Sequence, residues 1–158
     1  MILLFVVLTY SCSQPAKEPL DLSKSTILIS PNIKLPMHET VVNVLTEEVA
    51  KRTGIELERG DNWDNTTIIA LIIEGDSELY GRPVSARTGD KIPELKKEGY
   101  RIFHENKNGK DILWISGADE RGVLYGIGKL LRTAEMLDNK ITITNNIDYS
   151  TSPEYTIR

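Results

Sequence analysis

The chain has 158 residues, enough for one domain with a single hydrophobic core and too few for two ordinary domains. Its hydrophobic content of 40% and charged content of 27% are typical of a globular protein. The formal net charge is −4, and lysines and arginines alternate with acidic residues instead of clustering. A nucleic-acid surface would need clustered basic residues, so we expect no nucleic-acid partner.

The N-terminus begins with an apolar run, residues 2–8, far shorter than the ~20 residues of a membrane-spanning helix. The chain's single cysteine, Cys12, follows a few residues later. This layout is similar to the signal of bacterial lipoproteins. The resemblance implies that residues 1–12 are an export signal and that Cys12 is acylated, so that a lipid anchor is the membrane contact. The alternative is a buried N-terminal strand with an inert thiol.

The polar, proline-containing residues 13–24 predict a tether, and an ordered domain is expected over residues 25–150. A β-branched run at 26–30 indicates the first strand. Apolar residues on one face then predict a helix over 39–52, for which Gly54 is the expected C-terminal cap.

Strands follow this helix. Alternating residues 55–58 predict a half-exposed strand, and the apolar run 67–73 predicts a strand covered on both faces. Residues 75–96 are hydrophilic and predict a long connection with at most one helical turn. Residues 99–105 and 111–116 predict a hairpin, because the intervening Asn108-Gly109 suits a turn with positive φ angles.

The last helix is expected to begin after Gly117, with Asp119 as its N-cap. Gly122 and Gly126 lie one turn apart, which would let this helix approach the sheet closely. A final strand is predicted at 141–144. The predicted order is β-α-β-β-β-β-α-β, with consecutive antiparallel strands after the first helix. We therefore expect an α+β fold, a mixed sheet with two helices packed on one face.

Three segments near the second helix resemble a known domain: residues 99–102 (Gly-Tyr-Arg-Ile), residues 122–126 (Gly-Val-Leu-Tyr-Gly) and residues 130–132 (Leu-Leu-Arg). Together with the hairpin strand at 112–117 they resemble the N-terminal accessory domain of bacterial α-glucuronidases. The related domain 2 of β-hexosaminidases has a looser version of the same pattern. The resemblance implies a small sandwich packed beside a catalytic (β/α)8 barrel.

The C-terminal residues 151–158 are similar to the segment that leads into the barrel of such enzymes. The chain stops at Arg158, where that barrel would begin. We therefore expect residues 151–158 to start a linker, the barrel to be the partner, and this chain to be a fragment of the enzyme.

No catalytic residue is expected in this chain. Glycoside hydrolysis usually needs two carboxylates across the scissile bond. The adjacent acids Asp119 and Glu120 are a candidate pair, but their place at the start of a helix, as cap and first-turn residue, explains them. His38 and His104 lie too far apart in sequence to suggest a metal site. The glycines fit neither nucleotide-binding pattern, so no cofactor is expected.

Three aromatic residues are weak candidates for carbohydrate contact: Trp63 in a loop, Tyr80 in the long connection and Trp114 in a strand. Packing in the core or against a neighbouring domain is the preferred interpretation of all three. Two functions remain open. The first is a non-catalytic domain of an exported glycoside hydrolase that acts in polysaccharide or xylan breakdown, of the α-glucuronidase type or the β-hexosaminidase type. The second is a free-standing surface lipoprotein that binds glycans.

Overall fold

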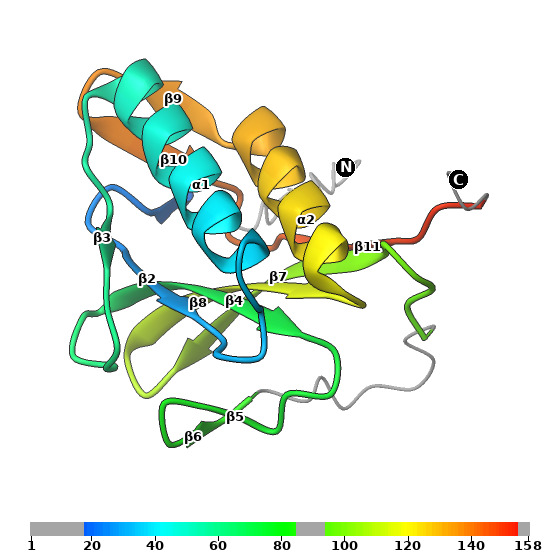
Figure 1. Ribbon diagram of the computed structural model, residues 1–158. Coiled ribbons are helices and arrows are strands. Elements are labelled where there is room, and N and C mark those ends of the chain that lie inside the picture. The colour runs from blue at the N-terminus through cyan, green and yellow to red at the C-terminus, as the bar shows by residue number, and fades with distance from the viewer. Residues whose placement is uncertain (1–17, 85–93, 155–158) are drawn as a thin grey trace, which may run out of the picture.

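The computed structural model describes residues 18–84 and 94–154 (Figure 1). The predicted signal with Cys12, and the residues that end at Arg158, lie outside the described ranges. The helices are α1 (Met37–Thr53) and α2 (Glu120–Thr133). The strands are β1 (Leu20–Asp21), β2 (Thr26–Ile29), β3 (Glu58–Arg59), β4 (Thr67–Ile73), β5 (Glu78–Leu79), β6 (Arg82–Pro83), β7 (Tyr100–Lys107), β8 (Lys110–Gly117), β9 (Glu135–Leu137), β10 (Lys140–Ile143) and β11 (Asp148–Thr151).

The main sheet has six strands in the order β11-β7-β8-β4-β2-β3. Strand β7 is antiparallel to both β8 and β11, whereas β2, β4 and β8 run parallel to one another. The expectation of a consecutive antiparallel set was therefore wrong. Helix α1 is the crossover that lets β4 start in the same direction as β2, and parallel strands require such a connection. The predicted α+β architecture with a mixed sheet is confirmed.

Both helices cover one face of this sheet, and the β5–β6 pair lies below the opposite face (Figure 1). Strand β4 alternates between the two sides: Ile69 and Leu71 join the core under the helices, and Ile68 and Ile72 join a smaller cluster on the far face. The prediction that 67–73 is covered on both faces is confirmed, because the five central residues of β4 are buried.

Two connecting segments contain more structure than their composition predicted. The tether expected at 13–24 is shorter, because β1 pairs with β10 in a second sheet and Leu20 and Leu22 are buried. The connection predicted over 75–96 includes the β5–β6 pair, whose Leu79 is 1% exposed. One buried leucine is enough to hold a short polar segment against a core. Part of this connection, residues 85–93, is outside the described ranges.

Local turn chemistry behaves as predicted. Gly54 caps α1 with φ 74°, and its N–H donates to the carbonyl of Ala50 at 2.8 Å. Asn108 and Gly109 both have positive φ, 53° and 76°, at the turn between β7 and β8. The strand expected at 55–58 is shorter and lies further along the chain, as the exposed two-residue strand β3. Among the described residues, no helix has the length and apolar character needed to cross a membrane.

Candidate functional site

Asp119 joins the start of α2 to the loop before β7. Its Oδ1 accepts a hydrogen bond from the backbone N–H of Gly122 at 2.9 Å, which confirms the predicted N-cap. Its Oδ2 accepts a second hydrogen bond, from the backbone N–H of Glu98 at 3.0 Å. Sequence patterns did not indicate this second bond, because the two residues lie 21 positions apart. Both oxygens of the carboxylate therefore serve the fold.

The glycines at the start of α2 allow the helix to lie directly on the sheet. A Cβ atom at Gly122 would collide with the carbonyl oxygen of Gly99, and one at Gly126 would lie 2.5 Å from Cγ2 of Ile115. A Cβ atom at Gly117 would collide with the backbone of Asp119. The close approach predicted for Gly122 and Gly126 is confirmed.

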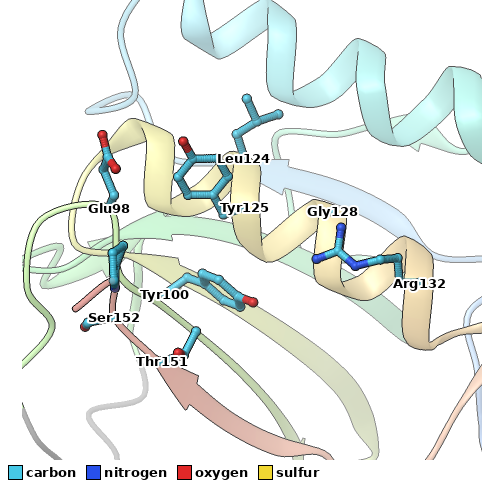
Figure 2. Close-up of a pocket in the computed structure, with 9 residues that line it drawn as sticks. Glu98, Tyr100, Leu124, Tyr125, Gly128, Arg132, Thr151 and Ser152 are labelled. Carbon is cyan, nitrogen blue, oxygen red and sulfur yellow. The ribbon is translucent and has the colours of Figure 1, made fainter. Parts of the chain in front are cut away.

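Beside this close packing lies a hollow of about 330 Å³, between α2, the edge strand β11 and its neighbour β7 (Figure 2). Its lining consists of Glu98, Tyr100, Leu124, Tyr125, Gly128, Arg132, Thr151, Ser152 and Pro153. In Figure 2 the helix supplies one wall, and the strand residues Tyr100 and Thr151 lie opposite it. The three segments that resemble the α-glucuronidase domain, at 99–102, 122–126 and 130–132, thus each contribute a residue to this hollow. The C-terminal residues 151–153 line it as well.

Aromatic rings continue this surface outward. Tyr125 is 41% exposed and Tyr149 is 37% exposed, although both are large and partly apolar. The ring centroids of Tyr149 and Tyr100 are 5.9 Å apart, and Nζ of Lys129 lies 4.5 Å from the Tyr149 centroid. Burial raises the pKa of Tyr100 above its ordinary value. We name the surface formed by Leu124, Tyr125, Tyr149 and Pro153 around this hollow the α2 face.

Among the residues that the structure describes, Glu98 is the one carboxylate that lines this hollow, and it is already paired. Glu98 is 3% exposed, and its Oε1 accepts a hydrogen bond from Nη1 of Arg121 at 3.0 Å. The hydrogen bond and charge of Glu98 raise the pKa of Arg121. A glycosidase needs a second carboxylate across the scissile bond. The geometry of this hollow is suited to receiving a side chain or a partner surface.

The three aromatic candidates for carbohydrate contact lie near the far face of the sheet, away from the α2 face. Trp63 and Trp114 are 5% and 1% exposed, with ring centroids 6.0 Å apart. Tyr80 is 38% exposed and donates its hydroxyl to the carbonyl of Ile29 at 3.2 Å. The two indoles are thus brought together by the fold. Carbohydrate contact at these residues stays a prediction.

Metal ligands do not converge anywhere in residues 18–84 and 94–154, where no group of three or more His, Cys, Asp or Glu is placed to hold an ion. His104 lies instead in a structural network. Its two ring nitrogens are each 2.8 Å from an acceptor, the carbonyl oxygen of Asn145 and Oδ1 of Asp111. Asn106 donates to the same oxygen of Asp111 at 2.8 Å.

Comparison with known families gives a direct match for this architecture. The family model for glycosyl hydrolase family 20, domain 2, matches residues 11–147. The chain belongs to this family. The expectation of an accessory domain of glycoside hydrolases is therefore confirmed. No curated protein sequence matches the chain.

Solved structures share the fold at low sequence identity. A family GH115 4-O-methyl-α-glucuronidase with specificity for decorated arabinogalactans superposes with a TM-score of 0.58 and 19% identity, over 82% of this chain and 17% of that one. The chitobiase of Flavobacterium johnsoniae gives 0.56 and 18%, over 90% of this chain and 20% of that one. The N-acetyl-β-hexosaminidase of Streptomyces plicatus gives 0.52 and 12%, over 87% and 24%. This domain thus spans at most about a quarter of these enzymes.

Proposed function

We propose that the domain is a non-catalytic part of a glycoside hydrolase and that it packs against a catalytic (β/α)8 barrel through the α2 face. Two observations support the proposal together. The chain matches the family model, and exposed aromatic residues surround a hollow of about 330 Å³. A surface of this kind gains stability when a partner covers it, because burial of apolar area is favourable.

The path of the chain supports this choice of surface. Strand β11 ends at Thr151, and Thr151, Ser152 and Pro153 line the hollow themselves. The described chain therefore ends beside the α2 face, which supports this face as the contact for a following domain. A partner tethered there has a high effective concentration at this surface, so modest contacts are enough to hold it.

For the reaction of the whole enzyme we propose polysaccharide breakdown of the α-glucuronidase type, as in xylan. The supporting observations are the Gly-Val-Leu-Tyr-Gly and Leu-Leu-Arg segments in α2 and the fold shared with the GH115 enzyme. The alternative is a β-hexosaminidase, supported by the family match and by the chitobiase fold. Release of glucuronic acid or of N-acetylglucosamine by the longer enzyme separates the two.

We further propose that the enzyme is exported and anchored by a lipid on Cys12. The support is the short apolar run that ends near the chain's single cysteine. Mass spectrometry of the mature N-terminus is expected to find diacylglycerol on Cys12. An unprocessed N-terminus with a free thiol would overturn the anchor.

The docking proposal is tested first by reading the gene beyond codon 158. An open or frameshifted continuation with eight strand–helix repeats is expected, and a continuation without them removes the proposal. The second test compares Tyr125→Lys with Glu78→Lys, an exposed control on β5, in the domain and in the longer enzyme. Tyr125→Lys should lower the melting temperature of the longer enzyme but not that of the domain alone. Glu78→Lys should change neither melting temperature. Equal effects of Tyr125→Lys with and without the barrel would contradict docking through this face.

A further inference from the structure

A second hollow, of about 170 Å³, lies on the far side of the sheet from the helices. Three segments enclose it: the β5–β6 pair, the loop that contains Trp63, and the ends of β7 and β8 at their shared turn. It is lined by Trp63, Arg82, Pro83, Glu105, Lys107, Asn108, Lys110, Ile112 and Trp114. The α2 face lies on another side of the molecule, so the two surfaces are open to separate tests.

The base of this hollow is apolar and its indole N–H groups are already used. Trp63 and Trp114 are almost fully buried beside Ile112. Trp63 donates its ring N–H to the carbonyl of Leu79 at 3.0 Å, and Trp114 donates to Oε2 of Glu105 at 3.0 Å. Both N–H groups are therefore already satisfied, and the two rings, at 5% and 1% exposure, form a fixed base under the hollow.

The sides of the hollow are positively charged, although the chain as a whole carries −4. Among the described residues that line it, Arg82, Lys107 and Lys110 contribute three cations and Glu105 contributes one carboxylate. The guanidinium of Arg82 lies over the Trp63 ring, 5.1 Å from its centroid. A guanidinium stacked on a ring keeps the N–H groups at its edge free for a carboxylate.

Lys110 is held in place by the neighbouring loop. Its Nζ donates to the carbonyl of Asp64 at 3.2 Å and to the carbonyl of Asn65 at 2.9 Å. An ammonium has three donors, so one is left for a ligand. Lys107 is exposed and forms no ion pair within the described residues. The apolar base is thus surrounded by the stacked guanidinium of Arg82, the exposed ammonium of Lys107 and the anchored ammonium of Lys110.

We propose that this hollow binds a small sugar acid, a single ring that bears a carboxylate. The cations recognise the carboxylate, and the ring lies over the apolar base formed by Trp63, Trp114 and Ile112. The volume of about 170 Å³ is below that of ordinary drug-sized pockets, which limits the ligand to one ring. This proposal stands apart from docking on a barrel, because no residue of the α2 face takes part.

The two tryptophans of the chain provide a direct probe, because each gives one indole N–H signal in a ¹⁵N–¹H spectrum. Titration of the 158-residue chain with glucuronate is expected to shift both signals, with saturation in the millimolar range and weaker binding at high salt. Glucose tests the need for the charge, and acetate tests the need for the ring. Absence of a shift with glucuronate, or equal shifts with glucose or acetate, overturns the proposal.

Substitutions locate the site. Arg82→Gln and Lys107→Gln should each weaken glucuronate binding by about tenfold, because each removes a charge-assisted contact. Lys51→Gln, an exposed lysine on α1, is the matched control and should leave binding unchanged. Lys107 is exposed at the end of β7, so its variant remains folded and informative even if Arg82→Gln does not. Unchanged affinity in Lys107→Gln, or an equal loss in Lys51→Gln, overturns this location.

Discussion

The Cα of Gly122 faces the carbonyl of Gly99 so closely that no side chain fits between them. One glycine belongs to the first turn of α2 and the other precedes β7. Their contact places the helix against the end of the hairpin and lets Asp119 reach the backbone of Glu98. The hollow on the α2 face lies beside this close approach.

Gly122→Ala should therefore destabilise the domain, by up to about 2 kcal/mol. In an isolated helix this substitution gains about 1 kcal/mol, but here the added methyl meets backbone atoms, and overpacking of a core costs about 1–3 kcal/mol. Urea unfolding followed by circular dichroism measures the change. The steric argument predicts the sign, which is opposite to helix propensity.

Gly128→Ala is the control in the same helix. Its Cβ would lie 3.3 Å from Nη1 of Arg132, the end of a flexible side chain that has room to move. We expect a gain between 0 and about 1 kcal/mol from helix propensity. Equal effects of the alanine at 122 and at 128 would show that α2 does not lie on the sheet as described.

Substitutions of Asp119 should separate its two hydrogen bonds. Asp119→Asn retains an oxygen for Gly122 but cannot accept from Glu98 as well, so a loss of about 1 kcal/mol is expected. Asp119→Ala loses both bonds and should cost about 2 kcal/mol. Thermal melts of the three proteins give the order. An Asn variant as stable as the wild type would argue against the bond to Glu98.

Tyr100 should make the domain less stable at alkaline pH. Burial raises the pKa of its hydroxyl in the folded state above the ordinary value of 10.0. Above pH 10 the unfolded chain loses this proton first, so the stabilising contribution, complete below pH 10, falls as pH rises towards the folded-state pKa. Tyr100→Phe should reduce the slope of unfolding free energy against pH above about pH 10. An unchanged slope would contradict this assignment.

The hydrogen bonds around His104 should stabilise the main sheet near its edge strand β11. Its imidazole is 5% exposed and connects Asp111 on β8 with the carbonyl of Asn145, in the segment before β11. His104→Phe removes the imidazole that lies between these two acceptors, at an expected cost of about 1–3 kcal/mol. Asn106→Ala removes an exposed bond to the same carboxylate and should cost less than about 0.5 kcal/mol. Urea titrations of both variants test the contrast, and a reversed order would refute it.

Much of the fold could be predicted because its determinants are local. The Asn108-Gly109 turn, the Gly54 cap and the Asp119 cap each depend on residues within one turn of the chain. Strand β4 was recognisable because burial on both faces requires a continuous apolar run. These features need no information about distant residues.

Other features depended on distant partners and were missed. The segment at Leu20 was expected to be a tether, but it pairs with Ile143 more than a hundred residues later. Leu79 lies in a polar stretch, and only the far-face cluster explains why it is buried. The parallel alignment of β4 with β8 likewise depends on the long connection through the β5–β6 pair and β7, which strand composition does not specify.

The candidate sites divide in the same way. Sequence patterns identified Trp63 and Trp114 separately, but only the fold brings their rings to within 6.0 Å of each other beside Arg82. Tyr125 was part of a recognised segment, yet its exposure became visible only when α2 was placed against the sheet.

The sequence by itself determined both helices, most strands of the main sheet, the turns and the family, because periodicity, caps and glycine spacing act over short distances along the chain. The tertiary structure alone decided which side chains share a surface. Exposed tyrosines gather beside α2, and cations gather around the buried indoles on the far face. The physical reason is that burial and charge depend on neighbours in space, and the parallel crossover brings together residues that lie dozens of positions apart.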